Sequence, residues 1–100
     1  MKVVWSNRAK SHLRLIVDYI WDHNPNAAIR VNEVIVEAAQ QLVEFPKMGR
    51  PGRVAGTREW VIAGLPYIVA YRQRDNRIEI AAALHAARKW PRNFGGQQAQ

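Results

Sequence analysis

The side chains that could do chemistry in this chain of 100 residues are mostly basic, and they gather in its second half. Guanidinium groups bind phosphates through paired hydrogen bonds, and aromatic rings offer surfaces on which nucleobases stack. Both kinds of side chain occur in one stretch, as Arg50, Arg53, Arg58, Arg72, Arg74, His85, Arg88, Lys89 and Arg92 with Trp60, Tyr67, Tyr71 and Trp90. This mixture predicts contact with a nucleic acid or another polyanion.

The rings also have an interpretation that involves no ligand. Trp5, Trp21 and Trp60 are large enough to dominate the area of a core or of a subunit contact. Tyr67 and Tyr71 fall on one face of a predicted strand, where packing across strands is an equal alternative to a functional role. Both interpretations of the rings stay open at the level of the sequence.

Two other kinds of site are not predicted. The chain has no cysteine, and its histidines, His12, His23 and His85, lack the spacing of metal ligands. A serine nucleophile is also not expected, because Ser6 and Ser11 do not follow a strand at a sharp turn. We therefore expect no metal and no cofactor.

The charge is unevenly distributed along the chain. Residues 1–45 hold five Lys or Arg and five Asp or Glu, whereas residues 46–100 hold ten and three. The second half therefore carries the whole net charge of +7, since ten minus three is seven. Such a field attracts polyanions, or an acidic protein, although a basic surface can also serve solubility alone.

No segment predicts a membrane span or a secretory signal. The longest apolar run, residues 78–84, contains Glu79 and is far shorter than the roughly 20 residues of a span. The first residues lack the hydrophobic region of a signal peptide. We expect one cytoplasmic domain over residues 1–94 and a flexible tail of small, polar residues at 95–100.

Two helices are predicted in the first half. Apolar residues recur every three or four positions between residues 9 and 21, after Ser6 or Asn7 as a cap. A second such stripe follows Asn24 as cap and Pro25 at the first helical position, and it extends to Phe45. The short connection between the two stripes predicts an antiparallel helical hairpin.

Four strands are predicted around this hairpin. Residues 2–5, 57–63, 67–73 and 77–84 have strand character, and the glycines and prolines of 46–56 predict a loop. In the last strand, alternation predicts Ile78, Ile80, Ala82 and Leu84 on one buried face. The expected fold class is α+β, with an N-terminal strand and a two-helix hairpin packed on a small antiparallel sheet in the order β-α-α-β-β-β.

Four motifs in this order give the chain a resemblance to a known family. They are F-P-x-x-G-R at 45–50, G-T-R-E at 56–59, P-Y-I-V-A-Y-R at 66–72 and L-H-A-A-R-K-W-P at 84–91. Together they resemble the RelE/ParE superfamily of toxins from bacterial type II toxin-antitoxin modules, within its ParE branch. The resemblance covers nearly the whole chain and implies the same helical hairpin on a small antiparallel sheet.

The resemblance implies one of two activities. RelE-like members cleave messenger RNA in the ribosomal A site, whereas ParE-like members inhibit DNA gyrase. Arg88 matches a RelE arginine, but Phe94 falls where RelE has a tyrosine, Ala63 falls where it has an arginine, and Arg50 and Arg53 match its basic pair only loosely. These departures favour gyrase inhibition.

The alternatives remain an mRNA endonuclease, in which His85 and Arg88 would be catalytic, and a non-toxic basic module that binds nucleic acid. The expected contacts with the target or nucleic acid are Arg50, Arg53, Arg58, Arg72, His85, Arg88, Lys89 and Trp90.

The partners implied by the resemblance are an acidic antitoxin, in a complex that can be hetero-oligomeric, and DNA gyrase. For the nuclease alternative the target is the ribosome with mRNA. Promoter DNA is expected to bind only through the antitoxin, and no membrane partner is expected.

Overall fold

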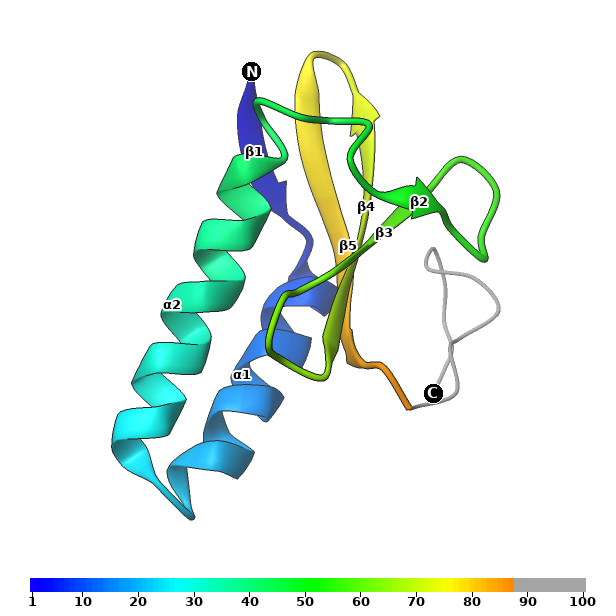
Figure 1. Cartoon of the computed structure of the whole chain (residues 1–100). Helices are drawn as coiled ribbons and strands as arrows, with labels where there is room; N and C mark the ends of the chain where they lie inside the picture. The colour runs from blue at the N-terminus through cyan, green and yellow to red at the C-terminus, as the bar shows by residue number, and fades with distance from the viewer. Residues whose placement is uncertain (88–100) are drawn as a thin grey trace.

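The computed structural model describes residues 1–87, in which two helices pack on one face of a five-stranded sheet (Figure 1). The strand order in the sheet is β1-β5-β4-β3-β2. The elements are β1 Lys2–Trp5, α1 Asn7–Trp21, α2 Pro25–Gln41, β2 Arg50–Pro51, β3 Arg58–Val61, β4 Tyr67–Arg74 and β5 Arg77–His85. The α+β class and the order of elements are as expected. The predicted tail at 95–100 and the end of the predicted domain at 94 lie outside the described residues.

Both helices begin where the sequence predicts. The Ser6 hydroxyl accepts a hydrogen bond from the Ala9 N–H at 3.0 Å, and the Asn24 side-chain oxygen accepts one from the Ala27 N–H at 3.1 Å. Pro25 occupies the first position of α2, where its missing N–H is not needed. The two helices run in opposite directions as a hairpin (Figure 1).

The second helix is shorter than predicted, because it ends at Gln41 and not at Phe45. The N–H groups of residues 42–44 donate to carbonyls three residues back, so the last turn tightens before Pro46. Leu42 is still buried, but Phe45 is 58% exposed and leaves the helical stripe.

The sheet is mixed, whereas the sequence predicted an antiparallel one. β1 pairs with β5 in parallel, with Lys2 opposite Arg77 and Trp5 opposite Ile80, and the other neighbours are antiparallel. A parallel strand needs a long crossover, which the helices that follow β1 begin. The predicted loop at 46–56 also contains the two-residue strand β2, which pairs with Arg58 and Glu59 of β3.

A β-bulge reverses the faces of β5 beyond Ala81. Ala70 of β4 lies opposite Ala82, but Tyr71 lies opposite Ile80, so Ala81 has no partner on β4. The prediction that Ala82 and Leu84 share a face with Ile78 and Ile80 is therefore wrong. Ile78 and Ile80 belong to the core under the helices, whereas Ala82 and Leu84 form a second buried cluster with Ala70.

Side chains near the start of α1 hold this bulge in place. The Ser6 N–H donates to the Ile80 carbonyl at 3.0 Å, and its hydroxyl donates to the Ala81 carbonyl at 3.3 Å. The His12 Nδ1 accepts a hydrogen bond from the Ala83 N–H at 3.2 Å. The irregular part of β5 is thus satisfied by α1, which the sequence pattern of β5 alone could not indicate.

The main core lies between the helices and the sheet. Its buried residues are Ala9, Ile35, Ala38, Ala39, Leu42, Ile62, Tyr67, Val69, Tyr71, Ile78 and Ile80. Tyr67 and Tyr71 share a face, as predicted, and Trp5 and Trp60 pack against the core, but Trp21 is 49% exposed. Neither helix of residues 1–87 is long and apolar enough to span a membrane.

Candidate functional site

Four of the predicted contact residues, Arg50, Arg53, Arg58 and Arg72, take part in interactions on the sheet and its connecting loop. Three of them engage two carboxylates, Glu59 of β3 and Glu79 of β5, which point to the sheet face away from the helices. This orientation follows from the register, because Glu59 lies opposite Ala70 and Glu79 alternates with the core residues beside it.

The first cluster fixes the loop that precedes β3. The Glu59 carboxylate is only 3% exposed and accepts a hydrogen bond from the Arg53 backbone N–H at 2.9 Å. It also accepts a hydrogen bond from Arg50 Nη2 at 3.3 Å, and Arg53 Nε lies 3.9 Å from it. Arg50 and Arg53 therefore present half-exposed guanidinium groups that a buried carboxylate partly neutralises.

Arg58 lies on the opposite face of the sheet from Glu59. It pairs in register with Tyr71, and its Nη1 donates to the Gly49 carbonyl at 2.7 Å. A weaker contact joins the same nitrogen to the Lys47 carbonyl at 3.5 Å. Because these bonds hold the 46–56 loop to β3, the structure gives Arg58 a role in positioning that loop.

Tyr71 of β4 also anchors this loop, through its hydroxyl. The sequence had left the role of this residue open. Its hydroxyl donates to the Pro46 carbonyl at 2.7 Å and accepts a hydrogen bond from the Gly49 N–H at 2.9 Å. Burial raises the pKa of Tyr71 above its ordinary value. A Cβ on Gly49 would lie 2.8 Å from the ring and 2.9 Å from the Glu59 carbonyl, so only glycine fits there.

The second cluster joins β4 to β5 at the end of the sheet near their connecting turn. Arg72 Nε lies 2.9 Å from Glu79 Oε1, Arg77 Nη2 lies 3.1 Å from Oε2, and Arg74 Nη2 lies 3.7 Å from Oε1. The pKa of Glu79 is lowered, chiefly by the hydrogen bond from Arg72. Desolvation, the second-largest effect, opposes this shift, and the hydrogen bond from Arg77 and the charge of Arg74 add smaller lowering effects.

We expect a pH-dependent loss of stability when Glu79 is replaced by glutamine. A depressed pKa in the folded state means that the carboxylate stabilises the fold above its ordinary pKa of 4.5, and that this stabilisation is lost as the pH falls through the folded value. Glu79→Gln should therefore lower the thermal midpoint at pH 7, and the difference from the parent should shrink as the pH falls below 4.5 and through the lowered pKa of Glu79. Thermal unfolding of both proteins across this range checks it, and a difference that persists unchanged at low pH would contradict it.

His85 stands at the far end of the same two strands. Its ring meets the ring of Tyr67 edge-on, with centroids 5.5 Å apart, and its Nδ1 accepts a hydrogen bond from the Ala87 N–H at 3.1 Å. This bond places the proton of the neutral ring on Nε2. The side chain is partly exposed, so the ring remains accessible at one edge of the sheet.

Within the described residues, the basic side chains predicted as contacts do not converge on one site. His85 lies opposite Tyr67, whereas Arg72 is five residues further along β4, which is about 17 Å at the rise of a strand. Within residues 1–87 no group of three acidic, histidine or cysteine side chains could hold a metal. Arg88, Lys89 and Trp90, the remaining predicted contacts, lie outside the described residues.

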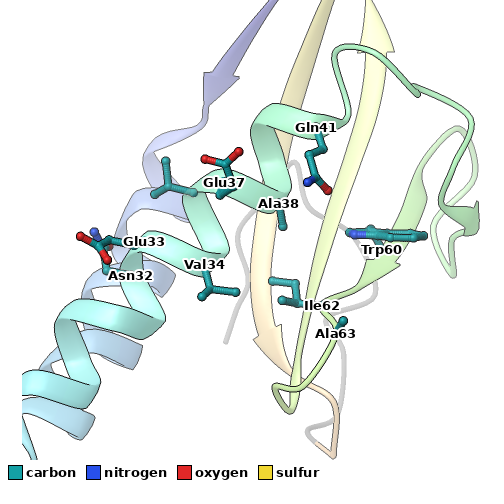
Figure 2. Close-up of a pocket in the computed structure, with 10 residues that line it drawn as sticks. Asn32, Glu33, Val34, Glu37, Ala38, Gln41, Trp60, Ile62 and Ala63 are labelled. Atoms are coloured by element: carbon teal, nitrogen blue, oxygen red, sulfur yellow. The ribbon is translucent and has the colours of Figure 1, made fainter.

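The sequence did not predict a groove between α2 and β3, which has a volume of about 740 Å³ (Figure 2). Apolar side chains form much of it, namely Val34, Val36, Ala38, Trp60, Ile62 and Ala63, and polar ones complete it, namely Asn32, Glu33, Glu37 and Gln41. Val34 and Val36 are 37% and 42% exposed. The available signal was Val36, an apolar residue outside the core stripe of α2.

The strand that borders this groove has a partly free edge. β2 pairs only with Arg58 and Glu59, so Trp60 and Val61 have no strand on that side among residues 1–87. Val61 is 46% exposed. Ala63, at the position where the resemblance has an arginine, lines the groove and brings no charge to it.

Comparisons with known proteins find relatives that are named as toxins. A protein named as the toxin Y4kP of Sinorhizobium fredii is 44% identical over 91 residues, which cover 90% of this chain and 93% of that protein. Toxin RelE2 of Caulobacter vibrioides is 39% identical over 87 residues, which cover 87% of this chain and 97% of that protein.

A solved structure and a family model extend the comparison to the fold and to most of the chain. A chain from the chromosomal ParDE TA system of P. aeruginosa superposes with a TM-score of 0.78 at 26% identity, covering 85% of this chain and 95% of that one. The model of the ParE toxin of the type II toxin-antitoxin system parDE matches residues 3–90. The chain therefore belongs to the ParE toxin family of type II toxin-antitoxin systems, within the RelE/ParE superfamily.

Proposed function

We propose that this toxin acts by binding DNA gyrase and does not cut RNA. The observation that carries the proposal is the separation of the bases: Arg50 and Arg53 engage Glu59, Arg72 engages Glu79, and His85 lies at the other end of β4 and β5. General acid-base catalysis needs its groups within hydrogen-bond reach of one reacting centre. Cations spread over a surface suit a binding inhibitor better. Action on gyrase also implies a cytoplasmic location.

A supercoiling assay tests this function. Antitoxin-free protein should block the supercoiling of relaxed plasmid by gyrase or trap cleaved DNA, and prior addition of the antitoxin should restore activity. Normal supercoiling at a large molar excess of toxin over gyrase would contradict the proposal.

Messenger RNA cleavage is the second candidate, and His85 is the observation that favours it. The ring is partly exposed at the end of β5, its neutral form carries the proton on Nε2, and Arg88 follows three residues later. An imidazole of this kind suits proton transfer near neutral pH. One of the relatives of the chain is also named RelE2.

We expect Arg88→Ala to reduce toxicity strongly without unfolding the chain. The residue follows the last strand in the most basic part of the sequence and corresponds to a RelE arginine, so it is our first choice for a target contact. Truncating an arginine that contacts a target costs affinity. Growth of cells that express each protein measures the effect, with Arg30→Ala on α2 as the control. Full toxicity of Arg88→Ala at equal protein levels would remove Arg88 from the site.

We also propose that an antitoxin segment neutralises the toxin by lying in the groove between α2 and β3. Apolar side chains of the segment would cover Val34, Ile62 and Trp60, and its backbone could pair with the free edge at Trp60 and Val61. The solved neighbour is titled as a ParDE system, which supports such a partner. Calorimetric titration with the product of the adjacent reading frame tests this, and an absence of binding would contradict it. Promoter DNA would then be bound through the antitoxin.

A further inference from the structure

The cluster around Glu79 contains more positive charge than its carboxylate can neutralise. One carboxylate engages three guanidinium groups, those of Arg72, Arg74 and Arg77. Lys2 of β1 lies opposite Arg77 in the parallel register and adds a fourth cation on the same face. With Asp75 of the turn as the other acid nearby in sequence, four positive and two negative charges leave a net +2 on this part of the sheet.

These cations form a row across three neighbouring strands, β4, β5 and β1. Adjacent strands lie about 4.8 Å apart, so the row is about 10 Å wide. It lies on the sheet face away from the helices, because Arg72 pairs with Glu79 and Lys2 pairs with Arg77, both outside the core register. The three arginine side chains are 42% to 55% exposed, so solvent reaches all of them.

The bonds to Glu79 orient the arginines without exhausting their donors. Arg72 uses its Nε–H, and Arg77 uses its Nε–H together with one terminal nitrogen, whereas Arg74 lies at ion-pair distance only. A guanidinium group has five N–H donors, so most of them remain available. Guanidinium groups that are fixed in orientation and retain free N–H donors match the geometry of phosphate oxygens.

We propose that Lys2, Arg72, Arg74 and Arg77 form a site for the phosphodiester backbone of nucleic acid, with Glu79 as the residue that positions the arginines. The site reads charge and spacing and contains no base-specific feature. It is independent of the proposed action on gyrase, because it needs only the toxin and DNA.

Fluorescence anisotropy with a labelled 20-base-pair DNA duplex tests the site. The variant Arg74→Ala/Arg77→Ala keeps the Arg72 pair with Glu79, so it should fold. The matched control Arg14→Ala/Arg30→Ala removes the same charge from exposed positions on the two helices, at the other face of the sheet. We expect the first variant to bind the duplex at least tenfold more weakly than the parent, and the control less than threefold more weakly. The slope of log K against log salt concentration should become shallower by about two for the first variant, because two fewer phosphates are neutralised.

A second variant, Lys2→Ala/Arg74→Ala, provides the same test without touching Arg77, and thermal unfolding checks that each protein is folded. Equal losses in the site variants and the control would overturn the proposal, because binding would then follow net charge alone. Absence of duplex binding by the parent at low salt would also overturn it. Polyglutamate could also displace the duplex at the same charge concentration as unlabelled DNA does. This result would overturn the proposal too, since the site would then show no preference for phosphate over carboxylate. The assay contains no gyrase, so its failure and a failure of the supercoiling assay are distinguishable.

Discussion

Tyr71→Phe should lower the free energy of unfolding by about 2 to 4 kcal/mol, through the loss of two hydrogen bonds to backbone groups. The hydroxyl joins the Pro46 carbonyl and the Gly49 N–H, and the contact with Gly49 is buried. Without it, the buried Gly49 N–H loses its acceptor and faces an aromatic ring. The loop that carries Arg50 and Arg53 should loosen as a result.

Urea denaturation of the purified toxin measures this effect, and Tyr67→Phe is its matched control. Tyr67 lies on the same face of β4 and is also nearly buried, but its hydroxyl makes no hydrogen bond to the rest of residues 1–87. Its replacement should cost less than about 1 kcal/mol. Equal losses in the two variants would mean that the loop is not held by the Tyr71 hydroxyl.

Val34→Asp should weaken antitoxin binding by about tenfold to hundredfold. Covering a valine contributes about 1.5 kcal/mol or more, and a new carboxylate in the groove between Glu33 and Glu37 must also be desolvated on binding. Since Val34 is 37% exposed, the substitution should leave the fold intact. Calorimetric titration of the antitoxin measures the change in affinity.

The control for this experiment is Ile29→Asp, which adds the same charge to an exposed apolar position of α2 away from the groove. We expect its affinity for the antitoxin to stay within about threefold of the parent. If both variants bind equally well, the antitoxin does not use the groove. If both lose affinity equally, the loss reflects charge on α2 and not a contact with Val34.

Local sequence signals predicted most of the fold. Ser6, Asn24 and Pro25 start helices because their chemistry satisfies or avoids orphan N–H groups, which needs no tertiary context. The end of α2 was misplaced because the apolar stripe continues to Phe45 after the helical hydrogen bonds have ended at Gln41. Apolar spacing indicates which residues are buried and not whether they are helical. Leu42 continues the apolar stripe because it is buried, although it lies in a turn.

The errors in the sheet have a different origin. Alternation in β5 could not reveal the bulge at Ala81, because Ser6 and His12, about seventy residues earlier, satisfy its backbone groups. The parallel pairing of β1 with β5 is likewise a contact between distant segments. Periodicity within one strand carries no information on either.

The candidate site was predicted only as a composition. The sequence indicated that arginines are abundant in the second half of the chain. Which of them pair with Glu59 and which with Glu79 depends on strand register. The groove beside α2 depends on how the helix sits against β3, so Val34 and Trp60 gave no separate signal of it. Residue type indicates which chemistry is available, and only the fold shows which groups lie together.

The most direct test of this account runs two assays on one antitoxin-free preparation: gyrase supercoiling and cleavage of mRNA on programmed ribosomes. We predict that supercoiling is lost, or that cleaved plasmid DNA is trapped, while the mRNA remains intact. Cut mRNA with normal supercoiling would contradict the account and would make His85 and Arg88 the catalytic candidates, with Phe94 in the place of the RelE tyrosine. Activity in neither assay would contradict it as well and would favour a non-toxic module that binds nucleic acid.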